Sequence, residues 1–420
     1  MKRPKLAGAF LFVCFLFAYL MFVKHHYSTS KPEAYRLPPH RRPDSDLSAD
    51  DGPTTDAGWR FQYGIMFDAG STGTRIHVFK FQIEDKGAPK LAQETFRAIK
   101  PGLSAYADDP QQVGRIVELL EVAKSSVPPS YWTSTPVVLK ATAGLRLLPG
   151  EKADQLLDRV RALFLDSPFL STDDSVSIMD GTDEGGLHSA HSPTVGMLDL
   201  GGGSTQITFS PQDEVRTHTG ERVRKTQRGR ALSPHYLGLG LMSARLAILG
   251  GVDAPPRGST ELVSPCLAPE YSGSWEHADM VYIVKGQSTG EPVYEACLSR
   301  VEKVLYQKVA KAFGVTDMDF YAFSFYYDRA VDIGAIDEKK GGSIRVSDYT
   351  DAAKRVCSDV SVGPQRSPFL CLDLVYISAL LQELGFPPHK QFRLARTINQ
   401  VETSWALGAT FHYIESLKAH

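Results

Sequence analysis

The sequence predicts an α/β protein with two lobes of related design, and two observations support this prediction. From about residue 61 onward, short apolar runs typical of buried strands alternate with apolar patterns at helical spacing. One motif also occurs twice, at GIMFDAGSTGTR (64–75) and VGMLDLGGGSTQ (195–206): an apolar strand, an Asp, and then a loop of Gly with Ser or Thr. The predicted boundaries are 61–180 together with 402–420 for lobe I, and 181–401 for lobe II.

Each element is predicted from the spacing of its apolar residues. The predicted strands are 63–67, 76–81, 137–140, 176–179 and one that begins at 195. The predicted helices have apolar faces made of Val113, Ile116, Val117, Leu120 and Ala123, then of Leu156, Leu157, Val160, Leu163 and Phe164, and finally of Leu407, Phe411, Ile414 and Leu417.

The composition excludes several classes of protein. The chain has 420 residues with 42% apolar and 22% charged content, which excludes disorder for most of its length. Lys and Arg total 46 against 48 Asp and Glu, so no basic surplus predicts a nucleic acid as partner. We therefore expect a small molecule as the main ligand.

The N-terminal segment predicts export into the secretory pathway. Residues 6–23 are 18 consecutive uncharged, mostly apolar positions, which as a helix at about 1.5 Å per residue would cross most of a bilayer core. Basic residues dominate the first five positions, so residues 1–5 are predicted to be cytosolic and the remainder lumenal, as in a type II membrane protein. A cleaved signal peptide is the alternative. Residues 24–60, rich in Ser, Pro, Asp and Arg, are predicted to form a flexible stem.

Four of the five cysteines lie in the second half of the chain, and a lumenal location makes disulfides the expected state. No spacing typical of a zinc site is present in the sequence. Three pairings are possible. We predict Cys266 with Cys297 and Cys357 with Cys371, because these loops do not interleave.

The repeated motif predicts a phosphate clamp with a metal ion. Glycines allow the backbone to turn sharply and bring N–H groups close to an anion, and the Ser and Thr hydroxyls add donors. Asp68 and Asp199 end the two strands and supply hard oxygen ligands suited to Mg²⁺ or Ca²⁺, directly or through water. A single loop of this kind could be a tight turn, but two copies with matched flanks favour a functional site.

Two further segments carry candidate chemistry. VVLKATAGLRLLP (137–149) places Thr142 and Ala143 at a strand end, where an ordinary strand-to-helix turn is the alternative. SIMDGTDEGG (177–186) carries a carboxylate cluster that includes Glu184, which could accept a proton from an attacking water; a solvated acidic turn is the alternative.

Taken together, DAGSTGTR, KATAGLRLLP, MDGTDEG, LDLGGGSTQ and ETSWALGA resemble the five ordered signature regions of the apyrase family, the nucleoside triphosphate diphosphohydrolases. YLGLGLMSARLA, FYAFSFYYDRA and the cysteine pairs are similar to the Golgi and secreted nucleoside-diphosphatase branch. The resemblance implies two RNase H-like lobes of the actin, hexokinase and heat-shock chaperone superfold, with nucleotide in the cleft between them. It also implies hydrolysis of nucleoside diphosphates (GDP, UDP, IDP) more than triphosphates, in the Golgi or another secretory compartment, with possible secretion.

The resemblance also implies a role for each motif residue. Asp68 and Asp199 would hold the hydrated cation, Glu184 would be the general base, and Ser204 with Gln206 would orient the attacking water. The residues implied to contact phosphate are Ser71, Thr72, Thr142, Ala143, Gly202 and Gly203. For the nucleobase, FYAFSFYYDRA (320–330) offers Tyr326 or Tyr327 as a stacking residue, and a plain aromatic strand is the alternative.

The sequence departs from the family pattern after Glu184. Only nine residues, GGLHSAHSP (185–193), lead to the next strand, which is too short for the usual helical crossover of about 10–12 residues. Residues 211–234 are also atypical, basic, and predicted to be a loop. Two hypotheses follow: a genuine shorter connection, or a catalytically impaired variant that only binds nucleotides or partners.

Overall fold

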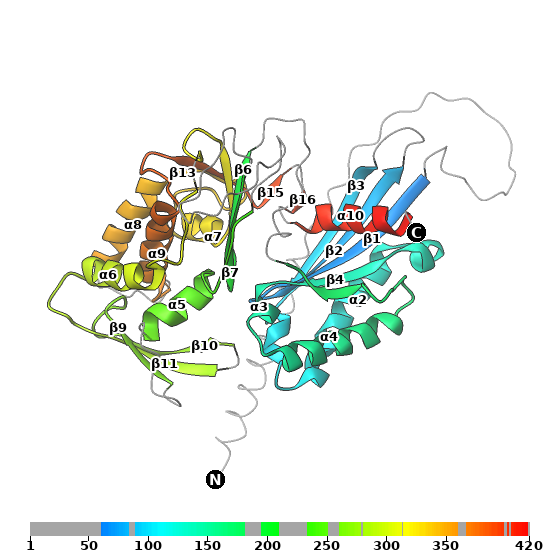
Figure 1. Ribbon diagram of the computed structural model, residues 1–420, viewed down its shortest axis with the longest axis horizontal. Coiled ribbons are helices and arrows are strands. Elements are labelled where there is room, and N and C mark those ends of the chain that lie inside the picture. The colour runs from blue at the N-terminus through cyan, green and yellow to red at the C-terminus, as the bar shows by residue number, and fades with distance from the viewer. Residues whose placement is uncertain are drawn as a thin grey trace, which may run out of the picture. The chain divides into compact units, whose positions relative to one another are not determined.

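The computed structural model describes residues 60–83, 89–180, 195–209, 233–250, 260–278, 280–312, 314–359, 367–398, 401–402 and 405–418 (Figure 1). All of them belong to one compact unit, Gly58–His420. The predicted cytosolic tail, membrane anchor and almost all of the stem lie outside the described residues. Among the helices of these ranges, none has the length and apolar content needed to cross a membrane.

The first lobe is built on a five-stranded sheet. Its strands are β1 Arg60–Ala69, β2 Thr74–Ile83, β3 Lys90–Ile99, β4 Val137–Ala141 and β5 Val176–Ile178, in the spatial order β3-β2-β1-β4-β5. β1, β2 and β3 pair antiparallel, whereas β4 and β5 run parallel to β1. The sequence predicted four of these strands and missed β3.

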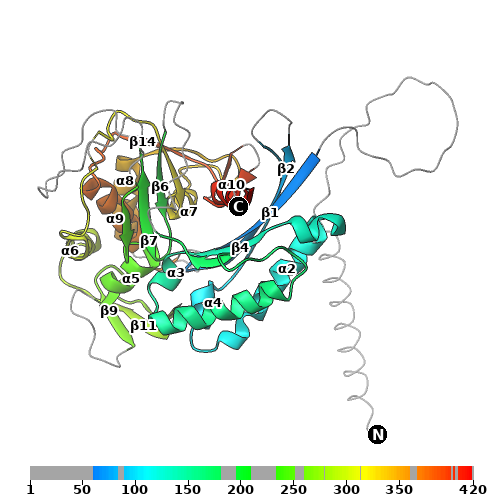
Figure 2. The ribbon, with the colours of Figure 1, turned by 45° about the vertical axis from the view of Figure 1, so that its right-hand side comes forward.

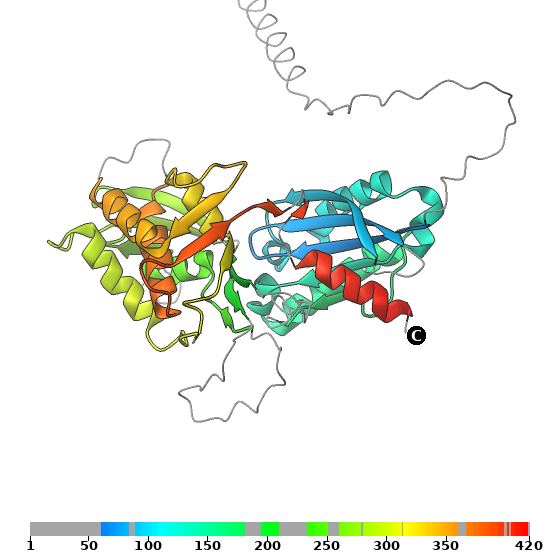
Figure 3. The ribbon, with the colours of Figure 1, turned by 90° about the horizontal axis from the view of Figure 1, so that it is seen from above.

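Helices cover both faces of this sheet. The helical segments are η1 Leu103–Tyr106, η2 Pro110–Gly114, α2 Arg115–Ser126, η3 Pro129–Ser134, α3 Ala143–Arg146, α4 Gly150–Leu165 and α10 Ala406–Lys418. α2 and α4 share one core with Ile65 and Phe67 of β1 (Figure 2). α10 packs on the other face, against Met66 and Phe79 (Figure 3). The alternation of apolar side chains along β1 thus supplies two cores.

The predicted apolar face of α2 is wrong at one position. Val117 is 40% exposed, and Leu119 is buried in its place. Val113 lies in the 3-10 turn η2, and the α-helix begins only at Arg115. Because a 3-10 turn has fewer residues per turn than an α-helix, the α-helical spacing counted from Val113 does not give the buried face of α2.

The second lobe repeats the topology of the first. Its six-stranded sheet contains β6 Gly196–Leu200, β7 Ser204–Thr208, β8 His235–Leu237, β12 Phe320–Ser324, β13 Gly342–Arg345 and β14 Gln391–Leu394, in the order β13-β14-β12-β6-β7-β8. β6, β7 and β8 pair antiparallel, and β12 and β14 run parallel to β6. Apart from β13, this is the order and direction of lobe I. The predicted two-lobed α/β fold is confirmed.

The remaining elements complete the second lobe. They are α5 Leu241–Gly250, α6 Val293–Leu305, α7 Phe325–Asp332, α8 Val346–Ser358, α9 Leu370–Glu383 and a three-stranded sheet of β9 Glu261–Ser264, β10 Ser272–His277 and β11 Met280–Gly286. The short pair β15 Thr397–Ile398 and β16 Val401–Glu402 forms a separate sheet that precedes α10. α9 is buried on every side along residues 370–381 and contacts α5, α6, α7 and α8.

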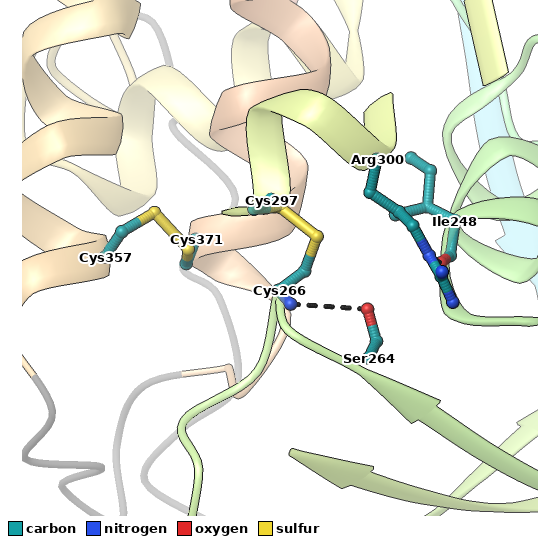
Figure 4. Close-up of a disulfide and its surroundings, with 7 residues drawn as sticks. All are labelled: Ile248, Ser264, Cys266, Cys297, Arg300, Cys357 and Cys371. Carbon is teal, nitrogen blue, oxygen red and sulfur yellow. Dashed lines mark hydrogen bonds between the residues drawn. A yellow bond between two sulfur atoms is a disulfide. The ribbon is translucent and has the colours of Figure 1, made fainter. Parts of the chain in front are cut away.

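Two disulfides fasten this helical layer (Figure 4). Cys266, after β9, bonds Cys297 of α6, and Cys357 of α8 bonds Cys371 of α9. Both predicted pairs are confirmed.

Candidate active site

A cavity of about 880 Å³ is lined by residues of both lobes. This volume is in the range of about 300–1,000 Å³ typical of small-molecule sites. The predicted site residues that line it are Asp68, Ser71, Thr72, Thr142, Ala143, Asp199, Gly202, Gly203, Ser204, Gln206 and Tyr327. Two predicted site residues are missing from this set. Tyr326 does not line the cavity, and Glu184 lies outside the described residues.

The two repeated loops are closed in the same way. In lobe I the Gly70 N–H donates to the Gly73 carbonyl (3.0 Å), and in lobe II the Gly201 N–H donates to the Ser204 carbonyl (3.0 Å). The loops also approach one another closely. A Cβ at Gly202 would lie 2.5 Å from Ser71 Oγ and 2.6 Å from Thr72 Cγ2, so these side chains of lobe I lie directly against the loop of lobe II.

Asp68 and Asp199 occupy equivalent positions at the ends of β1 and β6. Arg75, opposite Asp68 in the strand pair, donates to Asp68 Oδ2 at 2.9 Å. The other carboxylate oxygen, Asp68 Oδ1, and Asp199 Oδ1 are both buried without a hydrogen-bond partner. Burial raises the pKa of the Asp199 carboxyl, and the negative charge of Asp68 adds to this rise, whereas a hydrogen bond from Ser324 and the charge of Arg75 oppose it.

These two oxygens fit a divalent cation. A buried carboxylate oxygen without a donor is costly unless a cation or water satisfies it. The described residues contain no cluster of three or more His, Cys, Asp or Glu side chains that could enclose a metal ion. In proteins, Mg²⁺ is commonly bound by one or two carboxylates, and water and phosphate oxygens fill its remaining coordination positions.

The third motif places a backbone turn against the first loop. Thr142 N–H donates to the Ala69 carbonyl at 3.1 Å, and the helix α3 begins immediately afterwards. A Cβ at Gly144 would lie 2.8 Å from Ser71 Cα. Thr142 and Ala143 therefore lie beside the Ser71 loop, as their predicted phosphate-binding role requires.

Ser204 and Gln206 lie side by side on β7. The Gln206 amide Nε2 donates to Ser204 Oγ at 2.8 Å, and both side chains are almost fully buried at the cavity wall. Their hydroxyl and amide groups can together hold one water molecule, which is the role the resemblance implies.

The two candidate tyrosines differ sharply in position. Tyr326 is fully buried in the core of lobe II, so it is not placed to stack on a nucleobase. Tyr327 is also largely covered, but it lines the cavity, and the Arg396 guanidinium lies 5.5 Å from its ring centre. Both tyrosines lie on the helix α7, which begins at Phe325 directly after Ser324 at φ 57°, so they belong to neither a loop nor a continued strand.

Several cavity residues were not predicted from the sequence. Ser324 ends β12, the strand equivalent to β4, and directly precedes the first residue of α7, as Thr142 directly precedes the first residue of α3; the internal repeat was the signal that could have found it. Deeper in lobe II, Arg245 donates to both carboxylate oxygens of Asp373 (3.1 and 2.6 Å), and Arg329 Nη1 lies 3.6 Å from the same carboxylate. The partners Arg245 and Asp373 are 128 residues apart, so no local pattern indicated the pair.

Comparisons with known proteins identify the family of this chain. The family model described as GDA1/CD39 (nucleoside phosphatase) matches residues 60–420. Ectonucleoside triphosphate diphosphohydrolase 6 of Homo sapiens is 50% identical over 425 residues, which covers 96% of this chain and 88% of that protein. The protein of the same name from Mus musculus is 55% identical over 376 residues, with coverage of 85% and 82%. Nucleoside diphosphate phosphatase ENTPD5 of Homo sapiens is 46% identical over 382 residues, with coverage of 84% and 88%.

A solved structure supports the fold. The crystal structure of nucleoside triphosphate hydrolases from Neospora caninum is similar with a TM-score of 0.56 at 14% identity, covering 86% of this chain and 93% of that one.

Proposed function

This chain belongs to the GDA1/CD39 family of nucleoside phosphatases, and from that premise we propose that it hydrolyses nucleoside diphosphates, namely GDP, UDP and IDP, more readily than triphosphates. The observation that carries the proposal is the pair of closed Gly/Ser/Thr loops, one from each lobe, that line one cavity together with the orphaned oxygens of Asp68 and Asp199. The products are the nucleoside monophosphate and inorganic phosphate.

Each site residue has a separate role in an in-line displacement at the terminal phosphorus. Water attacks the terminal phosphorus, the bond from that phosphorus to the bridging oxygen breaks, and Glu184 accepts the proton of the water. Ser204 and Gln206 orient the water, while the two loops and the Thr142 turn hold the phosphate oxygens. Asp68 and Asp199 would hold Mg²⁺ or Ca²⁺, which supplies charge neutralisation at the phosphate oxygens when bound.

The nucleobase is expected to bind at Tyr327. Its ring lies at the cavity wall beside Arg396, and Arg396 is within 3.5 Å of the Asp328 carboxylate, which holds the guanidinium near the ring. An aromatic face and a planar guanidinium are surfaces on which a base can stack.

The cellular location follows from the N-terminal segment. We infer a type II protein of the Golgi or another secretory membrane, anchored by residues 6–23, with the catalytic lobes lumenal and with a secreted form if the segment is cleaved. The two disulfides agree with an oxidising compartment.

Phosphate release from a panel of nucleoside di- and triphosphates, with Mg²⁺, with Ca²⁺ and with excess EDTA, tests the proposal. We expect turnover of GDP, UDP and IDP that stops in EDTA. Glu184→Gln should abolish turnover and keep nucleotide binding, whereas the control Glu118→Gln, on the exposed face of α2, should leave both unchanged. Full turnover in EDTA would contradict the metal site.

The alternative of a variant that binds nucleotides without hydrolysing them rests on a separate observation. The alignment with the Homo sapiens ectonucleoside triphosphate diphosphohydrolase 6 spans 425 positions, although this chain has only 420 residues. The human protein therefore contains residues that have no counterpart in this chain. Tight nucleotide binding without turnover by the wild-type chain would identify the impaired, binding-only variant. Inserting a family-length connection after Glu184 should then restore turnover.

A further inference from the structure

We propose that Arg146 is a positioning residue that ties together three segments of the candidate active site, one of which belongs to the other lobe. The inference rests on the proposed function, because its consequence is a correctly placed phosphate and water site. Arg146 is the last residue of the short helix α3, which starts at the Thr142 turn. The backbone N–H of Arg146 donates to the Thr142 carbonyl oxygen at 3.3 Å.

The guanidinium of Arg146 joins two further segments. Nη1 donates to the carbonyl oxygen of Met179 at 2.6 Å, at the end of β5. Nη2 lies 3.0 Å from Nε2 of His235 on β8. A planar guanidinium with donors in a fixed fork can hold two such acceptors at a defined angle, which the single ammonium of a lysine cannot.

Each joined segment leads directly to a predicted catalytic group. Met179 precedes Asp180 and the segment that reaches Glu184. His235 is paired across the β7–β8 ladder with Gln206, which carries the water-orienting amide. A shift of Arg146 would therefore move the phosphate turn, the end of β5 and the water site relative to one another.

The contact also fixes the protonation state of His235. A guanidinium has donors and no acceptor, so His235 Nε2 must accept, and the neutral ring carries its proton on Nδ1. Burial lowers the pKa of His235, the positive charge of Arg146 lowers it further, and Asp180 opposes both. On β7 the residue opposite, Gln206, carries no charge.

The contact is therefore present at neutral pH and is lost in acid. The folded-state pKa lies below the ordinary value of about 6.5, so the neutral ring persists until the pH falls through that lowered pKa. Protonated His235 would repel Arg146 and would no longer accept its hydrogen bond.

Arg161 provides a matched control within the same lobe. It lies on α4 and donates Nη2 to the carbonyl of Val176 at 3.0 Å, at the start of β5, just as Arg146 donates to Met179 at the end of the strand. Arg161 does not line the cavity. Both arginines fasten a helix to β5, and of the two only Arg146 contacts His235 among the described residues.

The experiment compares Arg146→Met, Arg161→Met, His235→Ala and His235→Gln. We measure kcat and KM for GDP from pH 5 to 8, thermal unfolding, and the His235 titration by NMR. Arg146→Met and His235→Ala should lower kcat by about 10- to 100-fold, with KM little changed, because sub-ångström displacement of catalytic groups slows the reaction. His235→Gln keeps an acceptor that does not titrate, so it should retain kcat near wild type and lose the acidic fall in rate.

The controls decide between positioning and general stability. Arg161→Met should leave kcat and the pH profile unchanged, whatever its melting temperature. Removal of Arg146 should also raise the pKa of His235 in the NMR titration. Equal losses of kcat in the two arginine variants, or an unchanged acidic limb in His235→Gln, would overturn the proposal. If the wild type releases no phosphate from any nucleotide, the proposed function fails, and the contact is judged by the His235 titration alone.

Discussion

Gly102→Ala should impair catalysis although Gly102 does not line the cavity. Gly102 lies between β3 and η1, at φ −68° and ψ 162°, a conformation that alanine adopts without strain. A Cβ at this position would nevertheless lie 2.3 Å from the Gly70 carbonyl oxygen and 2.8 Å from the Ser71 carbonyl carbon. These are backbone atoms of the first phosphate loop, so no side-chain rotation can relieve the overlap.

The size of the effect follows from that distance. An ordinary contact begins at 3.4 Å, so the loop or Gly102 must move by about 1 Å. A misplacement of about 1 Å costs about 100-fold in rate, or about 2.7 kcal/mol of barrier. The loss of chain entropy in the unfolded state favours alanine by about 0.4–1 kcal/mol, but this acts on the free energy of unfolding and leaves the reaction barrier of the folded enzyme unchanged.

The assay is steady-state phosphate release with GDP, accompanied by thermal unfolding. Gly150→Ala is the matched control, because a Cβ at Gly150, the first residue of α4, would meet no atom within 4 Å. We expect Gly150→Ala to keep full activity and equal or greater stability. A folded Gly102→Ala protein with kcat within threefold of wild type would refute the argument that this glycine sets the position of the loop.

Three further predictions concern other parts of the molecule. Replacing Cys357 and Cys371 together by serine should lower the free energy of unfolding by about 3 kcal/mol in urea titrations, and an unchanged value would show that the closed loop contributes nothing. Arg245→Met leaves the fully buried Asp373 without its bidentate partner and should cost about 3–5 kcal/mol by the same measurement, with much of that recovered when Asp373 is also made apolar. Asp199→Asn should raise the Mg²⁺ concentration needed for half-maximal phosphate release, and an unchanged requirement would remove Asp199 from the metal site.

The repeated motif in the sequence predicted those parts of the site that consist of a single strand–loop–strand unit within one lobe. Asp68 and Asp199 follow apolar strands, and the same strand–loop–strand unit forms in both lobes, so local pattern was sufficient. β3 was missed because its side chains are exposed or half-buried on both faces, which leaves no alternation to detect.

Features that depend on distant contacts could not be predicted. Tyr326 is adjacent to Tyr327 in the sequence, and the abrupt change from β12 to α7 at Ser324 decides which ring reaches the cavity. Arg146 and His235 are 89 residues apart, and their contact depends on the approach of the two lobes. The role of Gly102 is likewise visible only once the Gly70 loop is placed beside it.

The position of α10 has a consequence for biosynthesis. This helix follows all of lobe II in the chain, yet its residues Tyr413 and Ile414 complete the core beside β1, and a Cβ at Gly64 of that strand would lie 2.5 Å from Thr410. During vectorial synthesis one face of the first sheet must therefore remain bare while more than two hundred intervening residues emerge, about 10–40 s at typical elongation rates. Nascent chains halted before residue 406 should consequently present apolar β-sheet surface to chaperones, and premature termination there should be as damaging to the first lobe as a lesion within it.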